Sequence, residues 1–349
     1  MSTQLTIVDT SLRDGMSSVR QQFTPSDVTA VAGGLARAGV RLLEVGHGIG
    51  IGASSIQYGH AAASDVDYVH AAVDAVEDLA DVAVLYVPGI STLTVLDAVR
   101  EAGAHAVRIA THCTEADCAE QPIRHARASG MRVLSFLMMS HKLAPDALAE
   151  QARKLDSYGA QVIYVVDSAG ALTPAGAGQR VQALASTVEA QVGFHAHNNL
   201  GLAIGNTLAA IEHGASYVDG SLRGLGASAG NAQTEVLAVA LERAGYLTGV
   251  DAFALVDLAE RVIAPRMHEP QIVDETALLL GYYGLYSTFF HPAKRAADKY
   301  GLAVRDVLVE LGRRQAIGGQ EDMIVEVAAQ MALREDTMQP SPVATGSGA

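Results

Sequence analysis

The strongest constraint in this sequence is an alternation of short β-rich runs with Ala- and Leu-rich segments, repeated eight times. After each run comes a break of Gly, Pro, Ser or Thr, and then a segment whose apolar residues recur with helical spacing. The expected strands are Thr6–Ser11, Arg41–Gly46, Val82–Val87, Ala106–His112, Arg132–Ser140, Val162–Ser168, Val192–Asn198 and Tyr217–Leu222. Strands that alternate with helices pair in parallel through right-handed crossovers. Eight such units predict a closed (β/α)8 TIM barrel.

The texture of the chain changes after Asp251, where helical patterns follow one another without intervening strands. The expected helices there are Asp251–Ala264, Asp274–Tyr283, Pro292–Tyr300, Ala303–Gln315 and Gln320–Ala332. Helices without a sheet must bury their apolar stripes on another surface. We therefore expect a TIM-barrel catalytic domain over residues 1–248, a small C-terminal all-helical domain over 249–335 that docks a partner, and a disordered tail over 336–349.

The charge balance bears on partners and location. The chain has 24 Lys and Arg against 38 Asp and Glu, a formal net charge of −14 at pH 7. This negative field repels phosphate backbones and anionic lipids, so we expect neither nucleic acid nor a membrane as a partner. The start of the chain lacks the basic and apolar regions of a signal peptide, and no run of 18 apolar residues occurs. We expect a cytoplasmic protein.

Two histidines close the seventh expected strand, in the run His195-Ala196-His197-Asn198. Residues i and i+2 of a strand share a face, so both imidazoles project into the mouth of the barrel, where barrel enzymes place their working residues. Asp14 follows the first strand, which neighbours the eighth. Two histidines beside a carboxylate make a metal site with open coordination positions. The alternative interpretation is a pair of satisfied polar residues at a strand end.

Arg13 directly precedes the expected metal ligand Asp14. Its guanidinium fork can bind a substrate carboxylate through two hydrogen bonds or hold the charge of a developing enolate. Glu44 lies at the inward end of the second strand and is positioned to anchor Arg13. The alternative for Arg13 and Asp14 is a local surface ion pair.

These residues also carry a resemblance to a known family. The run Asp9-Thr10-Ser11-Leu12-Arg13-Asp14-Gly15, with Glu44 and the His195–Asn198 run, resembles the DRE-TIM metallolyase superfamily, which includes HMG-CoA lyase. Further runs resemble the 4-hydroxy-2-oxovalerate aldolase family within it: Arg108–Asp117, Val166–Leu172, Gly226–Ala232, Gly281–Ser287 and Gly318–Asp322. The match covers the chain from about residue 5 to residue 334.

The resemblance implies a divalent-metal-dependent class II pyruvate aldolase, a carbon–carbon lyase. Asp14, His195 and His197 would hold the metal, most often Mn²⁺, with Mg²⁺ or Co²⁺ as other choices, and Asp14 and His195 would also lie against the substrate. The metal would act as the Lewis acid that stabilises the pyruvate enolate. Arg13 would stabilise the enolate charge as well. Ser168 would hydrogen-bond the pyruvate unit, and the catalytic residue Tyr286 would lie beside the aldehyde half.

The implied reaction cleaves 4-hydroxy-2-oxopentanoate, or a close homologue, to pyruvate and acetaldehyde, in the meta-cleavage type of aromatic or steroid catabolism. Relatives of this type pass the aldehyde to an NAD-dependent acylating acetaldehyde dehydrogenase within a hetero-oligomer. The resemblance therefore implies such a dehydrogenase as the partner and a small 2-oxoacid as the substrate.

Two positions depart from the family pattern. Ser17 stands where the family has the histidine that acts as base on the substrate hydroxyl, and Ile49 stands where the family usually has aspartate. A serine hydroxyl is not a useful base at pH 7 unless another base takes its proton. A water held by Ser17 and relayed to His47 is the competing explanation. These departures leave open a relative with altered chemistry, such as a 2-oxoacid or acyl-CoA condensing lyase, and a base-deficient scaffold subunit.

Overall fold

The computed structural model describes residues 5–314, 316 and 320–338. Its eight strands form one closed barrel in chain order, and every neighbouring pair is parallel, including β1 with β8. The strands are β1 (Thr6–Leu12), β2 (Leu42–Val45), β3 (Asp81–Tyr86), β4 (Ala106–His112), β5 (Arg132–Met138), β6 (Val162–Asp167), β7 (Gln191–Ala196) and β8 (Ala215–Gly220). The predicted TIM barrel is confirmed.

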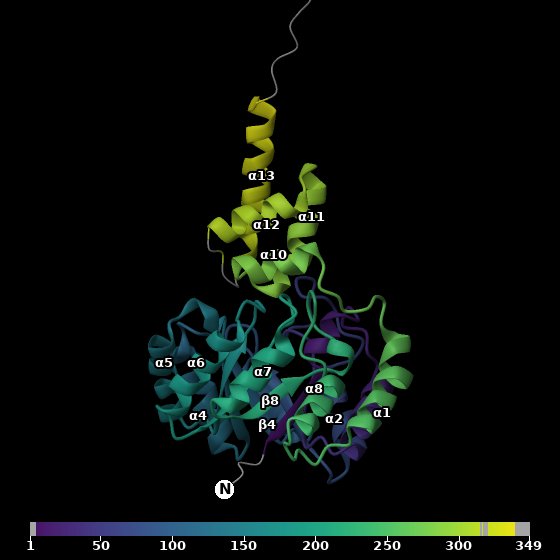
Figure 1. Ribbon diagram of the computed structural model, residues 1–349. Coiled ribbons are helices and arrows are strands. Elements are labelled where there is room, and N and C mark those ends of the chain that lie inside the picture. Colours follow the sequence, from purple (N-terminus) through teal and green to yellow (C-terminus); the bar gives the residue numbers. More distant parts are fainter. Residues whose placement is uncertain (1–4, 315, 317–319, 339–349) are drawn as a thin grey trace, which may run out of the picture.

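Eight helices cover the outside of the barrel, one after each strand (Figure 1). They are α1 (Pro25–Arg37), α2 (Asp65–Val76), α3 (Leu93–Glu101), α4 (Glu120–Ala128), α5 (Pro145–Tyr158), α6 (Pro174–Ala185), α7 (Ala203–Glu212) and α8 (Thr234–Arg243). Capping residues fix where several of them begin. Thr24 and Asp27 form a capping box at α1, and Thr173 caps α6 ahead of Pro174.

Seven of the eight predicted strands end at a different residue in the structure, and the first, second, third and sixth end only one residue away. The fifth was expected to reach Ser140, but β5 ends at Met138 because Met139 adopts a left-handed conformation with φ of 58°. The seventh was expected to reach Asn198, but β7 ends at Ala196, and His197 forms an isolated bridge with Asn231 instead. The sixth ends one residue early, at Asp167, and the eighth lies two residues earlier at both ends, over Ala215–Gly220.

The interior of the barrel changes character along its axis. Apolar side chains from the strands fill the middle, among them Val8, Leu134 and Val162. Nearer the carboxyl ends of the strands, the rings of Tyr164 and Phe136 pack against each other with centroids 4.5 Å apart. Position 193 has to be glycine beside them, since a Cβ there would lie 2.5 Å from the Tyr164 ring. The aromatic pair thus separates the apolar middle of the barrel from the polar residues at the carboxyl ends of the strands.

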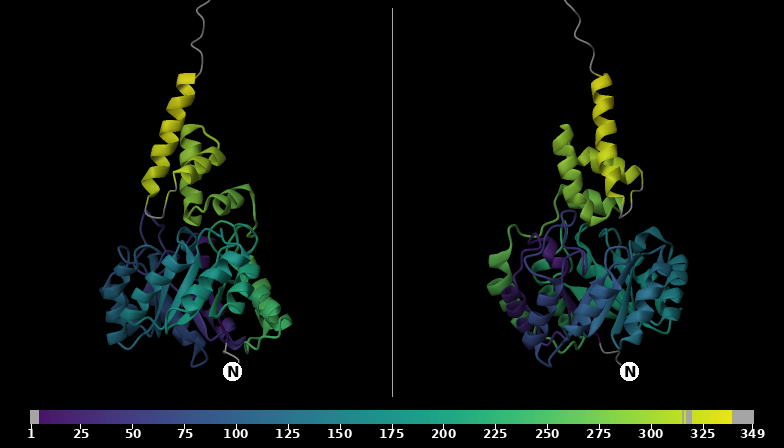
Figure 2. Two further views of the ribbon diagram at one scale, coloured as in Figure 1. Left: turned by 60° about the vertical axis from the view of Figure 1, so that its left-hand side comes forward. Right: turned by 180° about the vertical axis from the view of Figure 1, so that it is seen from behind.

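The chain after β8 has two parts that pack differently. The helix α9 (Ala252–Leu258) packs on α1 and α8, and its buried Leu255 and Leu258 join the core beneath those helices. Four further helices make a core of their own: α10 (Glu275–Tyr283), α11 (Phe290–Tyr300), α12 (Val304–Arg313) and α13 (Glu321–Met338). Figures 1 and 2 show these four standing on one end of the barrel, opposite the N-terminus. A C-terminal helical region is therefore confirmed, while the boundaries at 248 and 335 stay predictions.

Two sequence expectations concern the ends and surface of this region. Gln315 and residues 339–349 lie outside the described residues, and residues 336–338 of the expected tail continue α13.

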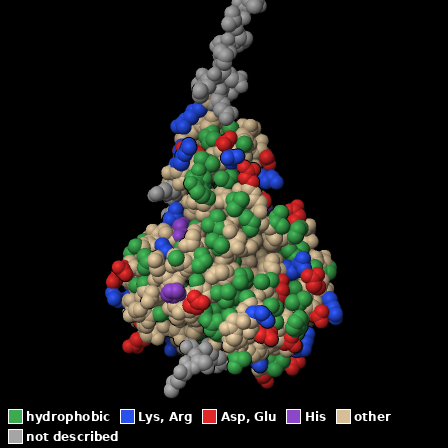
Figure 3. All heavy atoms as spheres, viewed as in Figure 1, with side chains coloured by type: hydrophobic (Ala, Val, Ile, Leu, Met, Phe, Trp, Pro, Cys, Tyr) green, Lys and Arg blue, Asp and Glu red, His purple; other side chains and the backbone are tan. Residues whose placement is uncertain are grey.

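Within the described part of the chain, no helix combines the length and apolar character that crossing a membrane requires. The face seen in Figure 3 mixes acidic and basic side chains with apolar patches, one of them over the base of the helical region.

Candidate active site

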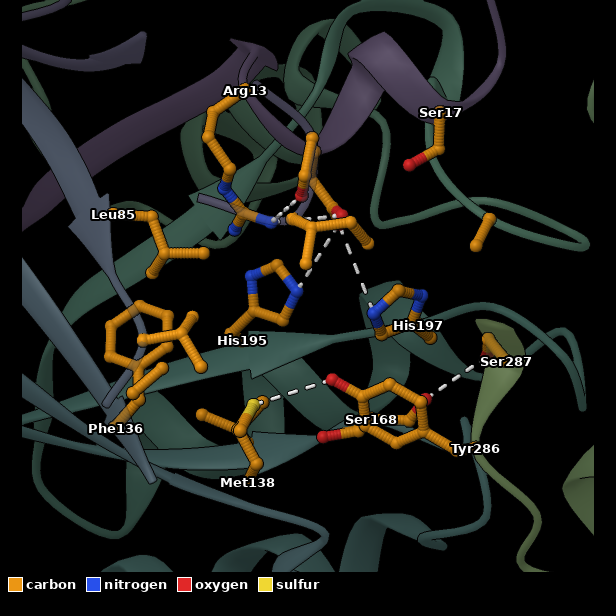
Figure 4. Close-up of a pocket in the computed structure, with 17 residues that line it drawn as sticks. Arg13, Ser17, Leu85, Phe136, Met138, Ser168, His195, His197, Tyr286 and Ser287 are labelled. Atoms are coloured by element: carbon orange, nitrogen blue, oxygen red, sulfur yellow. Dashed lines mark hydrogen bonds and ion pairs between the residues drawn. The ribbon is translucent and has the colours of Figure 1, made fainter. Parts of the chain in front are cut away.

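Three of the predicted site residues meet at the carboxyl ends of β1 and β7. Asp14 lies directly after β1, and its Oδ2 is 3.6 Å from His195 Nε2 and 3.8 Å from His197 Nε2. Figure 4 shows the rings of His195 and His197 next to each other in the pocket. Asp14, His195 and His197 are the only cluster of three or more potential metal-ligating side chains among the described residues, and all three are buried.

Hydrogen bonds around the three side chains prepare them to bind a metal. The Nδ1–H of His195 donates to Asp219 Oδ2 over 2.8 Å, which turns Nε2 of the same ring toward Asp14. Burial lowers the pKa of His197 to about 4, although the Asp14 carboxylate opposes this shift. Burial would raise the pKa of Asp14, but Arg13 and the two histidines outweigh it and hold that pKa well below its usual range. The donor set is therefore two imidazoles and a carboxylate, which suits a divalent ion.

Arg13 lies beside this donor set and is held from two sides. Its Nη1 is 3.0 Å from Asp14 Oδ1, and its Nε donates to Glu44 Oε2 over 2.7 Å. The predicted anchoring of Arg13 by Glu44 is thus present in the structure. Both partners are buried, so the Arg13–Asp14 contact is not the surface ion pair considered as the alternative.

A cavity of about 90 Å³ opens above these residues. Its polar lining consists of Arg13, Asp14, Ser17, Ser168, His195, His197, Tyr286 and Ser287. Its apolar lining includes Ile49, Leu85, Val87, Ala110, Phe136, Met138, Val166 and Ala227. All the predicted site residues therefore meet in one cavity, and the volume suits a small molecule.

The helical region supplies one wall of this cavity. Tyr286 lies just before the short helix η7 (Ser287–Phe289), and its hydroxyl is 3.3 Å from Met138 Sδ. The Ser287 hydroxyl donates to the Ser168 carbonyl over 3.0 Å and accepts from Asn199 Nδ2 over 3.0 Å. The segment that carries Tyr286 is thus fixed to the ends of two barrel strands.

The ring of His47 contacts the backbone of its own loop. Its Nε2 lies 3.0 Å from the Gly59 carbonyl, and its Nδ1 accepts from the Ile49 amide over 3.1 Å. Burial also lowers the pKa of His47 below its usual value. Both ring nitrogens are therefore occupied by the backbone of its own loop, and His47 does not line the cavity.

The sequence analysis missed several residues around the site. Asp219 and Arg108 lie behind His195 and Glu44, and Asn231 Nδ2 donates to Asp14 Oδ2 over 2.6 Å. One signal was available for two of them. Arg108 and Asp219 are charged residues within strands expected to be buried, and burying a charge is costly unless it finds a partner inside the barrel.

Comparison with known proteins agrees with this geometry. Residues 4–262 match the HMGL-like family, and residues 271–333 match the DmpG-like communication domain. The chain is 68% identical over 330 residues to a 4-hydroxy-2-oxovalerate aldolase of Nocardia farcinica, covering 95% of each chain. It is 65% identical over 344 residues to one of Rhodococcus jostii, covering 98% of this chain and all of the relative. The chain belongs to the 4-hydroxy-2-oxovalerate aldolase family.

The fold recurs in solved structures of distant proteins. The carboxyl transferase domain of Rhizobium etli pyruvate carboxylase superimposes with a TM-score of 0.80 at 17% identity, covering 96% of this chain and 61% of that one. At this identity the likeness concerns the fold alone. Membership of the aldolase family rests on the sequence matches, and a metal site is consistent with both the family and the Asp14, His195 and His197 cluster.

The donor set generates a direct test. We expect the purified protein to bind about one divalent ion per chain, and His195→Ala to weaken that binding strongly because two donors remain of three. Elemental analysis and chelator competition measure the effect. The control is His268→Ala, which removes an exposed imidazole away from the cluster. Full metal content in His195→Ala would refute the assignment.

Proposed function

We propose that this chain is a divalent-metal-dependent aldolase that cleaves 4-hydroxy-2-oxopentanoate, or a close homologue, to pyruvate and acetaldehyde. The observation that carries the proposal is the meeting of the Asp14, His195 and His197 donors with Arg13 in a cavity closed by Tyr286. The proposed ion is Mn²⁺, with Mg²⁺ or Co²⁺ as substitutes, and the proposed setting is the catabolism of aromatic compounds or steroids. The relatives named above support this reaction by their own names.

The chemistry needs an electron sink at the pyruvate half of the substrate. A divalent ion bound by Asp14, His195 and His197 supplies Lewis acidity there. Arg13 adds a permanent positive charge beside it, which stabilises the negative charge that the enolate oxygen gains when the carbon–carbon bond breaks. The Ser168 Oγ accepts the Met139 amide hydrogen over 2.9 Å, so its own proton is free to bind a substrate oxygen.

Cleavage also requires that the 4-hydroxyl lose its proton as the C3–C4 bond breaks, so that the aldehyde leaves and the electron pair forms the enolate. Ser17 is the residue of this chain at the position of the family's base. Figure 4 shows its hydroxyl pointing into the cavity across from His197. His47 is engaged by its own loop and does not line the cavity. The ionisable side chains on the described lining are Arg13, Asp14, His195, His197 and Tyr286.

The experiment that tests the proposed function is steady-state cleavage of 4-hydroxy-2-oxopentanoate with added Mn²⁺, coupled to reduction of the pyruvate formed. We expect metal-dependent release of pyruvate that a chelator abolishes. Absence of cleavage, with metal still bound, would refute the aldolase and favour the scaffold subunit, for which Ser17 is the motivating observation. No comparable observation favours an acyl-CoA condensing lyase, because the cavity of about 90 Å³ is small for an acyl-CoA.

Ser17 generates its own prediction. A well-placed general base contributes roughly 10²–10⁴-fold, so we expect Ser17→His to raise the cleavage rate at least about tenfold. We expect Ser17→His with Ile49→Asp to exceed the single variant, because a carboxylate orients the new imidazole. Exchange of the pyruvate methyl protons should change little in either variant, since that step does not involve the 4-hydroxyl. An unchanged cleavage rate in both variants contradicts the missing-base interpretation.

We further propose that the helical region docks an acylating, NAD-dependent acetaldehyde dehydrogenase in a hetero-oligomer that channels the aldehyde. The match to a communication domain over residues 271–333 supports this assignment. So does the apolar exposed face of α10, where the side chains of Leu278 and Tyr282 are 48% and 78% exposed. These residues are one helical turn apart, so they form a common surface.

The docking proposal predicts co-elution of the two proteins at micromolar concentration after co-expression. We expect Tyr282→Asp to separate them, because a charge would be buried in an apolar interface. The matched control is Leu247→Asp, which places the same charge at a 93% exposed apolar position on the barrel side. Separate elution of the unmodified proteins would count against the docking proposal.

A further inference from the structure

The guanidinium of Arg108 lies inside the barrel at the level just beneath the candidate active site. Arg108 is in β4, and its side chain has no exposed surface. Its Nη1 donates to Glu44 Oε2 over 2.9 Å, and its Nη2 donates to Asp219 Oδ2. Burial alone would lower its pKa, but Asp219 and Glu44 outweigh that effect and raise it above the usual value. Arg108 is thus a permanent cation between two buried carboxylates.

Each of those carboxylates is shared between Arg108 and a residue of the site. Glu44 Oε2 accepts from Arg108 and also from Arg13 Nε. Asp219 Oδ2 accepts from Arg108 and also from His195 Nδ1. The second oxygen of each carboxylate has no hydrogen-bond partner in the described part of the structure. The two carboxylates therefore act as bridges, and Arg108 is the group that both bridges have in common.

Two aromatic rings fix the position of this guanidinium. Its central carbon lies 4.2 Å from the ring centre of Phe136 and 4.8 Å from that of Tyr164. A planar cation stacks on aromatic faces and presents separate N–H groups in fixed directions, whereas an ammonium group is a compact point charge. The geometry at this position therefore suits arginine and does not suit lysine.

We propose that Arg108 is the positioning residue that ties the metal ligand His195 to the enolate-stabilising Arg13. It touches neither metal nor substrate. Through Asp219 it sets the orientation of the His195 ring, and through Glu44 it sets the place of the Arg13 guanidinium. Both groups act on one enolate, so their separation has to be fixed, and Arg108 is the link that fixes it. The inference rests on the proposed function for the role of Arg13.

The decisive variant is Arg108→Lys, which keeps the buried charge but cannot donate to both carboxylates from fixed positions. The first measurement is Mn²⁺ affinity of the metal-free protein by chelator competition, without substrate. Loss of a residue that orients a metal-binding histidine typically weakens metal binding or activity about 10–100-fold, and we expect an effect in that range. The second measurement is pyruvate methyl-proton exchange at saturating Mn²⁺. A residual fall in kcat there reports displacement of Arg13, because metal occupancy has been restored.

The matched control is Arg132→Lys. Arg132 lies over an aromatic ring at 5.4 Å and pairs with Asp81, as Arg108 pairs with its carboxylates, but at the opposite end of the barrel. We expect Arg132→Lys to leave both readouts unchanged, and thermal unfolding of the two variants shows whether stability alone differs. If Arg108→Met folds, it serves as a second probe of the link to His195 and Arg13. If Arg108→Met does not fold, Arg108→Lys alone tests that link.

Two results would overturn the proposal. Mn²⁺ affinity within twofold of the unmodified protein in Arg108→Lys removes the link to His195. Full recovery of the exchange rate at saturating Mn²⁺ removes the link to Arg13. A protein that binds Mn²⁺ and exchanges pyruvate protons but cleaves no 4-hydroxy-2-oxoacid would refute the proposed function without touching this inference, because neither readout uses the cleavage reaction.

Discussion

Five buried charges at the polar end of the barrel determine how the rest of the structure must be arranged. Two guanidinium groups, Arg13 and Arg108, alternate with the carboxylates of Asp14, Glu44 and Asp219. Burying an ion costs several kcal/mol unless partners and hydrogen bonds replace water, and removing one partner of a buried pair costs about 3–5 kcal/mol. The strands that carry these residues must therefore meet in one register. A closed barrel supplies that register, because its geometry fixes every strand relative to its neighbours.

Periodicity was enough to predict the barrel, since eight strand–helix units in order leave few topologies open. The metal cluster was predictable for a similar reason, because the spacing of His195 and His197 puts both rings on one face and the barrel brings β1 close to β7 through β8. The residues at which the strands end were harder to predict from the sequence. Nothing in the local sequence shows that Met139 would adopt a left-handed conformation and end β5 early, since that conformation is set by its tertiary contacts.

The second layer of the site escaped prediction because it depends on pairings between distant strands. Arg108 and Asp219 are 111 residues apart, and only the closed barrel makes them neighbours. His47 shows the opposite limit, because the sequence allowed it to act as the relay for a water held by Ser17. The contacts of both its ring nitrogens with the backbone of its loop favour the structural role. The positioning role of Ser287 was likewise not predictable from the sequence, since its contact with Ser168 joins the helical region to the barrel.

The charge count of the site also bears on the order in which products leave. Three carboxylates and two guanidinium groups sum to −1, so a divalent ion brings the site to +1 and a bound 2-oxoacid carboxylate neutralises it. Water screens a buried charge weakly, so such a charge has to be balanced by neighbouring charges. Pyruvate is therefore held by this balance, whereas the aldehyde is neutral and has only the surrounding walls to hold it. One of those walls is Tyr286, on a segment that Ser287 fixes to the barrel. We therefore expect the aldehyde to leave first, past the helical region that is proposed to dock the enzyme consuming it.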